Sequence, residues 1–357
     1  MPSCYVVRET EIAESFRVQQ IRGMFDYQNT VIRNEWNHTL PIEQNSWNIG
    51  LIVGHSGSGK TTMAQQMFDQ YKIHEDFEWK YGVAVVDCFP EDANTKDIVS
   101  TLSAVGFSSP PHWLKPFDHL STGQKFRVEL ARCLMEYKQG FVFDEFTSVV
   151  DRDVAKVGCL AISKLLRKRK EPPFVAVSCH YDIIDWLDPD WVYDVSTNRF
   201  EWRLERRKEK ISLDVFKSDT SAWKAFSEHH YLDDNIHKGA ECYIATWGNK
   251  PVGFCSVLHF PHASSKLFKR EHRTVVLPDF QGVGIGNKLS ETVASLYSER
   301  GYRFISATSA PSMIQHRKRS HLWRCTRFGR ASRASKTDII KQISNNRITA
   351  SFEYIGK

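Results

Sequence analysis

The chain has 357 residues, of which 41% are hydrophobic and 25% are charged, so it has room for two globular domains of ordinary size. Lysine and arginine number 48 against 42 acidic residues, and the formal charge of +6 indicates an anionic partner. No apolar run approaches the roughly 20 residues of a transmembrane helix, and the N-terminus lacks the apolar stretch of a signal peptide. These features argue against membrane-embedded and secreted classes and predict a cytoplasmic protein.

The basic excess belongs to one segment, residues 316–336, which holds eight of the lysines and arginines and no acidic residue. Without those eight the chain has 40 basic and 42 acidic residues, a net charge of −2. The eight cysteines are scattered and include no C-x-x-C pair, which predicts reduced thiols rather than disulfides.

A block of charge at residues 203–210 separates two regions that each alternate between strand-like and helix-like segments. We place a linker at residues 204–210, between a first domain at 1–203 and a second at 211–357. In the first domain the alternation is typical of an α/β fold with a mostly parallel, covered sheet. The predicted elements are strands at 50–53, 83–86, 141–143 and 174–177 and helices at 61–71 and 125–134.

Residues 54–61 read GHSGSGKT, which fits the pattern G-x-x-x-x-G-K-[ST] and stands between a strand and a helix, as a phosphate-binding loop must. The glycines allow backbone N–H groups to turn toward phosphates, Lys60 reaches the terminal phosphates, and the Thr61 hydroxyl is a ligand for Mg²⁺. We therefore predict that ATP contacts Gly54, Ser56, Gly57, Gly59, Lys60, Thr61 and Thr62.

The apolar strand at residues 141–143 ends in two acidic residues, Asp144 and Glu145. An aspartate at such a strand end can hold Mg²⁺, and the following glutamate can polarise an attacking water. We predict Asp144 as a second Mg²⁺ ligand and ATP contact, and Glu145 as a catalytic residue for ATP hydrolysis.

Three further stretches resemble the ABC-type ATPases, in that family's order. Residues 120–124 read LSTGQ and resemble the LSGGQ signature, Asp151 ends an SVVD stretch at the place of the D-loop, and His180 stands where the family has its catalytic switch histidine. The resemblance implies a P-loop ABC-type ATPase domain. It also implies a homodimer on ATP binding, in which Ser121, Gly123 and Asp151 contact ATP.

Two departures from the ABC pattern matter. Thr122 replaces the first signature glycine, and no glutamine follows the apolar segment that ends at Asp87, where the family has its Q-loop. About 60 residues separate Lys60 from Ser121, which leaves no room for a long coiled-coil insertion. Transport and SMC-like architectures are therefore disfavoured, and we expect no membrane partner.

The second domain has a different order of elements, with a hairpin closed at residues 248–250 and a glycine-rich turn before a helix. The predicted strands are at 211–215, 242–247, 252–260, 274–277, 303–308 and 347–355, and the predicted helices are at 220–231 and 287–299.

Residues 281–286 read QGVGIG and match Gln/Arg-x-x-Gly-x-Gly, which resembles the pyrophosphate loop of the GNAT acetyltransferases. The resemblance covers 211–357 and implies an α+β GNAT fold with a mixed sheet that splays at 304–308. The stretches 229–232, 271–278 and 319–324 also resemble a phage- and mobile-element-associated subgroup. The implied cofactor is acyl-CoA, most simply acetyl-CoA, with backbone N–H groups before the loop as oxyanion donors. The implied contacts are Val276, Leu277, Gln281, Gly282, Val283, Gly284, Ile285 and Gly286.

Acyl transfer also needs a group that takes a proton from the attacking amine. Many members of the family use a tyrosine in the helix after the splayed strand, but residues 311–316 contain none. The candidate catalytic residues are Glu271 and His272, beside the strand that bears the loop, and Ser306 as a hydroxyl donor. Solvated strand-end residues are an equally good interpretation of each.

The basic segment, residues 316–336, mixes cations with aromatic and small side chains. Cations neutralise phosphates and aromatics stack on unpaired bases, a combination that suits nucleic acid. A solvated charged face and contacts with the phosphates of CoA are the alternatives. The predicted nucleic-acid contacts are Arg317, Lys318, Arg319, Trp323, Arg324 and Arg327.

Together these patterns predict an α/β two-domain enzyme that hydrolyses ATP and transfers an acyl group from acyl-CoA to an amine, with a base in DNA or RNA as the acceptor. Two alternatives stay open. One is a small-molecule or protein acetyltransferase gated by the ATPase, and the other is an ATP-dependent nucleic-acid clamp whose GNAT half only binds.

Overall fold

The computed structural model describes residues 3–74, 77–170, 172–203, 210–230, 235–260, 267–330 and 348–356. The chain divides into two compact units. The first comprises Met1–Phe77, Tyr137–Val149 and Leu166–Arg207, and the second comprises Glu78–Glu136, Val150–Leu165 and Lys208–Lys357. The second unit thus joins a helical part of the predicted ATPase domain to the predicted acyltransferase domain. Most of the predicted linker, residues 204–209, lies outside the described residues.

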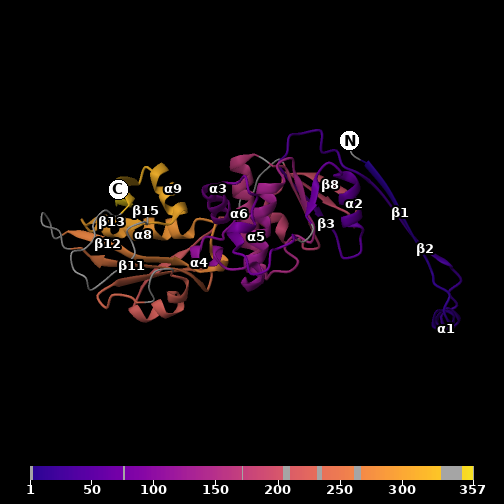
Figure 1. Ribbon diagram of the computed structural model, residues 1–357, viewed down its shortest axis with the longest axis horizontal. Helices are drawn as coiled ribbons and strands as arrows, with labels where there is room; N and C mark the ends of the chain where they lie inside the picture. Colours follow the sequence, from indigo (N-terminus) through magenta and orange to yellow (C-terminus); the bar gives the residue numbers. More distant parts are fainter. Residues whose placement is uncertain are drawn as a thin grey trace. The chain divides into compact units, whose positions relative to one another are not determined.

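A six-stranded sheet forms the centre of the first unit (Figure 1). The strand that leads into the glycine-rich loop, β3, lies between β6 and β7, and only β8 pairs antiparallel. Every residue of β3 is buried, as expected for a strand covered on both faces. In sheet order the strands are β4 (Lys72–His74), β5 (Phe141–Phe143), β6 (Phe174–Ser178), β3 (Ile49–Val53), β7 (Trp191–Asp194) and β8 (Arg199–Trp202).

An antiparallel ribbon of β1 (Ser3–Glu11) and β2 (Val31–Thr39) precedes this sheet, and α1 (Phe16–Met24) lies at its tip (Figure 1). The sequence analysis did not predict the ribbon, because its strands are rich in charged and polar residues and lack an apolar face. The remaining helices of this unit include α2 (Lys60–Met67) and α7 (Ile183–Leu187).

The helical part of the second unit contains α3 (Thr95–Ala104), α4 (Pro110–Trp113), α5 (Thr122–Glu136) and most of α6 (Arg152–Arg169). The predicted strand at 83–86 is wrong. Residues Val85–Cys88 form the 3₁₀ turn η1, and the single bridge here joins Ala84 to Pro116. A short apolar run is compatible with either a buried strand or a buried turn, so its hydrophobicity did not decide between them.

A seven-stranded sheet forms the rest of the second unit, and only its β12–β13 pair is parallel. Helix α8 (Ile285–Glu299) packs on one face (Figure 1). The other face carries the 3₁₀ turns η3 (Thr220–Ala225) and η4 (Ser227–His229), where one helix was predicted. In sheet order the strands are β14 (Trp323–Arg330), β15 (Ile348–Tyr354), β13 (Arg303–Thr308), β12 (Phe268–Val276), β11 (Lys250–His259), β10 (Glu241–Trp247) and β9 (Asp214–Ser218).

This topology confirms the predicted fold class, an α/β first domain and a GNAT-type mixed sheet. The predicted hairpin is also confirmed, because Trp247 pairs with Lys250 across a two-residue turn. None of the eight cysteines, all of which lie in the described residues, forms a disulfide bond, as predicted. Within the described ranges, no helix has both the length and the apolar character that crossing a membrane requires.

Candidate functional site

The glycine-rich loop between β3 and α2 has the backbone of a phosphate cradle. Gly57 and Gly59 have φ angles of 79° and 89°, a left-handed conformation that favours glycine. The first N–H groups of a helix have no intrahelical partner. Because Gly59 caps α2 without a side-chain hydrogen bond, no side chain of the cap residue occupies them. Such donors at a helix N-terminus attract an anion. Lys60, Thr61 and Thr62 form the first turn of the helix.

Lys60 is buried, and its Nζ donates a hydrogen bond at 2.9 Å to the carbonyl oxygen of His55, at the other side of the loop. The ammonium is thus held where phosphates would enter. Trp36 of β2 lies beside the same loop, since its ring is 3.1 Å from the place of a Cβ added to Gly59. The sequence analysis missed Trp36, because an aromatic residue in a polar strand belongs to no motif.

The acidic residues and the histidine stand at the same edge of the sheet as this loop. Strands β5, β6 and β3 are parallel neighbours, so their carboxyl ends meet there. Asp144 and Glu145 follow β5, and His180 follows β6. Glu145 has a φ of 49°, an uncommon conformation, and its Oε2 accepts a hydrogen bond from Ser148 Oγ at 2.6 Å. Backbone strain of this kind often accompanies a functional position.

The residues predicted to hold Mg²⁺ are oxygen donors, the Thr61 hydroxyl and the Asp144 carboxylate. This donor set fits Mg²⁺, which proteins usually bind through one or two side chains together with substrate phosphates. Asp144 Oδ1 already accepts the Glu145 N–H at 2.9 Å, which fixes the carboxylate at the strand end. Across the described residues, no group of three or more His, Cys, Asp or Glu side chains forms a metal cluster.

The signature residues lie in the second unit, at the start of α5. Ser121 and Gln124 form a reciprocal capping box: Ser121 N donates to Gln124 Oε1 at 3.1 Å, and Gln124 N donates to Ser121 Oγ at 3.4 Å. Gly123 allows α5 to approach α6, since an added Cβ would lie 3.0 Å from Val154. Asp151 caps α6 through two hydrogen bonds of 3.0 Å. Their contact with ATP in a dimer stays a prediction.

The predicted acyl-CoA loop connects the 3₁₀ turn η5 (Pro278–Phe280) to α8. Gly282 and Gly284 have φ angles of 94° and 105°, and Gly284 caps α8 without a side-chain hydrogen bond. Gln281 Nε2 donates to the carbonyl oxygen of Val276 at 2.9 Å and fixes the loop to its strand. The arrangement repeats that of the ATP loop: a strand, left-handed glycines and a helix with unpaired N–H groups.

Strands β12 and β13 separate after a short parallel pairing, as predicted, and we call the region between their carboxyl ends the slot. β12 and β13 pair only from Phe268–Arg303 to Arg270–Ile305, so beyond this point the two strands separate. Leu277 N donates to the carbonyl oxygen of Val252 at 3.0 Å, which is at odds with its predicted role as an oxyanion donor. The N–H of Val276 points away from β11 in this antiparallel pair, toward the slot, and its role as an oxyanion donor stays a prediction.

Glu271, Ser306 and Arg317 form a buried network instead of a proton relay and a nucleic-acid contact. Arg317 is 1% exposed, and its Nη2 lies 2.9 Å from Glu271 Oε2 and 2.7 Å from Ser290 Oγ. Its Nη1 donates to Ser306 Oγ, and Thr274 Oγ1 donates to Glu271 Oε1. Burial would raise the pKa of Glu271, but the Arg317 charge and these hydrogen bonds hold it below its ordinary value. These side chains are occupied, which corrects the catalytic prediction for Glu271 and Ser306 and the nucleic-acid prediction for Arg317.

His272, next along β12, is the remaining candidate for proton transfer. Its Nε2 is buried and has no hydrogen-bond partner within the described parts of the chain. Burial first, and then the charges of Arg273 and Arg270, lower the pKa of His272 to about 4. The imidazole is therefore neutral at pH 7 and can accept a proton. An orphan buried nitrogen calls for a substrate or water partner.

The basic segment forms α9 (Pro311–Arg319) and β14, and residues 331–336 lie outside the described part. Trp323 is 5% exposed in the core beneath Arg317, which corrects its predicted role in base stacking. Arg324 Nη2 lies 2.5 Å from Glu353 Oε2. The side chains of Lys318, Arg319 and Arg327 are exposed. Phe328 is 55% exposed, and the centre of its ring lies 3.8 Å from Lys318 Nζ.

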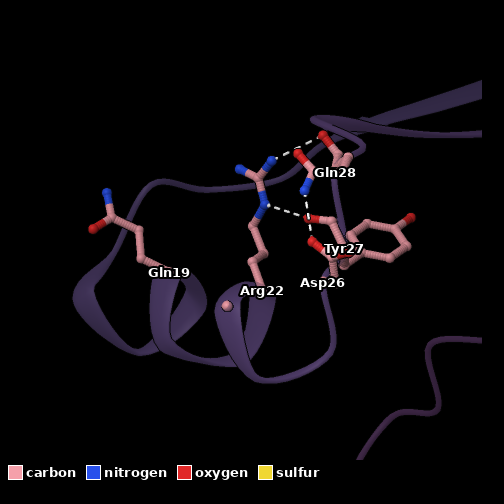
Figure 2. A pocket seen from close by; sticks show the side chains of 6 residues that line it. Gln19, Arg22, Asp26, Tyr27 and Gln28 are labelled. Atoms are coloured by element: carbon pink, nitrogen blue, oxygen red, sulfur yellow. Dashed lines mark hydrogen bonds between the residues drawn. The ribbon is translucent and has the colours of Figure 1, made fainter.

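A shallow pocket lies at the tip of the β1–β2 ribbon (Figure 2). Arg22 holds the loop after α1 by donating to the carbonyl oxygens of Tyr27 and Gln28, at 3.1 and 3.0 Å. Its guanidinium is thus used within the loop, and the pocket adds no chemistry to either site.

Comparisons with known proteins found one family model and several similar solved structures. The family model described as the acetyltransferase (GNAT) family matches residues 209–317. No curated protein matches the chain. One similar solved structure is a dimeric ATP-binding cassette in a post-hydrolysis state bound to ADP and Pi, with 16% identity over 55% of this chain and 96% of that one and a TM-score of 0.40. A second is an acetyltransferase of Bacillus subtilis in complex with CoA, with 14% identity over 42% of this chain and 100% of that one and a TM-score of 0.31. A third is the ribosomal-protein-S18-alanine N-acetyltransferase of Escherichia coli, with 13% identity over 40% of this chain and 93% of that one and a TM-score of 0.31.

Proposed function

We propose that this chain, an ABC-type ATPase domain fused to a GNAT acetyltransferase domain, hydrolyses ATP and transfers an acyl group from acyl-CoA to an amine. The observation that carries the proposal is the repeated loop geometry. Helices α2 and α8 each begin at a left-handed glycine without a side-chain cap, after a strand of a different sheet. One chain therefore offers two separate cradles for phosphorylated ligands.

In the ATPase domain, Lys60 binds the terminal phosphates and the loop N–H groups hold the remaining oxygens. A Mg²⁺ ion held by Thr61 and Asp144 would neutralise developing charge on the phosphates. Glu145 orients the attacking water, and His180 lies at the same sheet edge to contact the γ-phosphate. Ser121 and Gly123 of a second copy complete the site, so hydrolysis proceeds in a dimer.

In the acyltransferase domain, the loop binds the pyrophosphate of acyl-CoA and the slot holds the thioester. The amine nitrogen attacks the thioester carbonyl, the C–N bond forms, and the Val276 N–H stabilises the oxyanion. His272 takes the proton from the attacking nitrogen. The C–S bond then breaks, and CoA leaves as a thiolate that is protonated by solvent.

The low pKa of His272 favours a weakly basic acceptor. A base with a pKa of about 4 cannot deprotonate an alkylammonium, but it can take the acidic proton of the intermediate that an aromatic amine forms. The exocyclic amine of a nucleic-acid base has this property. Exposed Phe328, with Lys318 beside its ring and exposed Arg327 preceding it in β14, offers a stacking ring and cations for such a substrate.

The test is to incubate the purified chain with ATP, Mg²⁺ and acetyl-labelled acetyl-CoA, separately with DNA, RNA, a protein mixture and simple amines. We expect label in nucleosides after digestion and mass spectrometry, and loss of that label in His272→Gln. Label in protein or small amines alone would favour the gated acetyltransferase instead. ATP hydrolysis without any acyl transfer would favour the clamp.

A further inference from the structure

The acyl-CoA loop is held by a residue of the signature helix, Arg127 of α5. Its side chain is 1% exposed. Nη1 donates to the carbonyl oxygens of Gly106, at 3.1 Å, and of Pro278, and Nη2 donates to the carbonyl oxygen of Asp279 at 2.7 Å. One guanidinium thus connects the end of the α3 region to the turn that leads into the acyl-CoA loop.

Three other contacts support this junction. Gly106 and Gly282 approach so closely that a Cβ on Gly282 would lie 2.7 Å from the Gly106 Cα. Ser108 N donates to Gln281 Oε1 at 3.2 Å. Lys164 of α6 donates from Nζ to the carbonyl oxygen of Val283 at 3.3 Å. The helical part of the ATPase domain therefore contacts the acyl-CoA loop along its length.

The helices that make these contacts begin at residues predicted to touch ATP. Arg127 lies on the helix that starts after Ser121, and Lys164 lies on the helix that Asp151 caps. The two helices pack tightly, since a Cβ on Gly158 would lie 2.8 Å from the Phe126 ring. Closely packed helices move as a body rather than deform, so a shift at their N-termini reaches the loop.

We infer that Arg127 is a positioning residue for the acyl-CoA loop and links the binding of nucleotide to the binding of acyl-CoA. The inference rests on the proposed function and specifies how its two halves communicate. A buried cation destabilises a fold unless hydrogen bonds and nearby negative charge compensate it, and the hydrogen bonds of Arg127 go to carbonyl oxygens of Gly106, Pro278 and Asp279, so its position depends on both sides of the junction. Linkage is reciprocal: ATP changes the affinity for acyl-CoA by the same factor by which acyl-CoA changes the affinity for ATP.

The experiment uses the full chain with Glu145→Gln, which is expected to bind ATP but hydrolyse it slowly. Calorimetry measures the Kd of acetyl-CoA with and without saturating ATP and Mg²⁺, and the Kd of ATP with and without acetyl-CoA. We expect the same change, roughly fivefold or more, in both directions. Adding Arg127→Met should return this factor to about one while both ligands still bind. Arg127→Lys keeps the positive charge but loses the planar guanidinium that donates to several carbonyl oxygens, so the change in Kd should lie between those of the parent chain and Arg127→Met.

A matched pair of glycine variants separates the junction from backbone strain. Gly282→Ala brings a Cβ into Gly106 and should also abolish the linkage, whereas Gly301→Ala, at a φ of 81° with nothing within 4 Å, should leave it intact. Equal acetyl-CoA affinities with and without ATP in the parent chain, or linkage that survives Arg127→Met, would overturn the inference. Absence of acetyl-CoA binding under every condition would instead overturn the proposed function.

Discussion

At the scale of single residues, the ion pair of Glu271 and Arg317 fixes the architecture of the slot. It joins β12 to α9, and hydrogen bonds from Arg317 to Ser290 and Ser306 add α8 and β13. Four elements around the slot therefore share one buried guanidinium. Removing one member of a buried ion pair strongly destabilises the folded state, because the charge of the other member is left buried without a partner.

The stability of the acyltransferase domain should reflect this pair. Arg317→Met leaves the Glu271 carboxylate buried and unpaired, and we expect a loss of about 3 kcal/mol in the free energy of unfolding. The double variant Glu271→Leu with Arg317→Met should recover most of it. Urea denaturation followed by tryptophan fluorescence measures both, and a double variant no more stable than the single one would contradict the account.

The same pair predicts a pH dependence. The pKa of Glu271 is lower in the folded state than its ordinary value of 4.5, so the folded state favours the charged form. This stabilisation is present above pH 4.5 and declines as the pH falls through the folded pKa. Thermal melts of the chain from pH 7 to 3 should show the decline, and the double variant should show a shallower one.

His272 predicts a separate pH signature, in activity. Because its pKa is about 4 rather than the ordinary 6.5, the imidazole stays neutral well below pH 6. If it accepts the proton, the acidic limb of kcat/KM lies near pH 4, and His272→Gln lowers kcat by roughly 10²-fold. An acidic limb near pH 6.5 would show that a different group titrates. For stability the sign is the same: the unfolded histidine gains a proton below pH 6.5, so stability declines from pH 6.5 toward 4.

At the scale of elements, the loop before α8 combines a left-handed backbone with a proposed role in binding acyl-CoA. Gly284 has a φ of 105°, and Lys164 Nζ lies 3.5 Å from the place of its missing Cβ. We expect Gly284→Ala to weaken acetyl-CoA binding about tenfold, because the loop N–H groups would turn away from the pyrophosphate. Gly301→Ala, with similar strain outside the loop, should bind normally. Equal binding by both variants, measured by calorimetry, would remove the loop from the site.

The elements also show how far a sequence can lead. The positions of both glycine loops, each between a strand and a helix, were predictable, because their glycines and flanking strands form motifs with a physical reason. The burial of Arg317 and Trp323 was not, since a run of cations predicts a surface and only the tertiary packing of α9 and β14 turns two of its members inward. The role of Arg127 was equally hidden, because its partners are carbonyl oxygens about 20 and 150 residues away.

At the scale of the whole molecule, the lysines and arginines of the basic segment do not form one continuous basic surface. Arg317 is buried, and Arg324, although exposed, pairs with Glu353, so Lys318, Arg319 and Arg327 are the exposed cations of the described basic segment that the Glu353 pair does not involve. The anionic ligands of this protein are instead expected mainly at its two glycine loops.

The ATPase half predicts a change of assembly with nucleotide. If the signature residues complete the ATP site of a second copy, as proposed, Glu145→Gln should form a dimer with ATP and Mg²⁺. Light scattering after size exclusion measures its mass. With Lys60→Ala added, the mass should be the same with and without ATP. A mass unaffected by ATP in Glu145→Gln alone would contradict the shared site.

The central claim is that one chain holds ATP and acyl-CoA in two separate cradles. Titration of acetyl-CoA into the chain saturated with ATP and Mg²⁺, with Lys60→Ala as the matched variant, tests it directly. The account predicts that each chain binds one acetyl-CoA with ATP present, and that Lys60→Ala loses ATP but still binds acetyl-CoA. Displacement of one ligand by the other, or no acetyl-CoA binding in either protein, would contradict it.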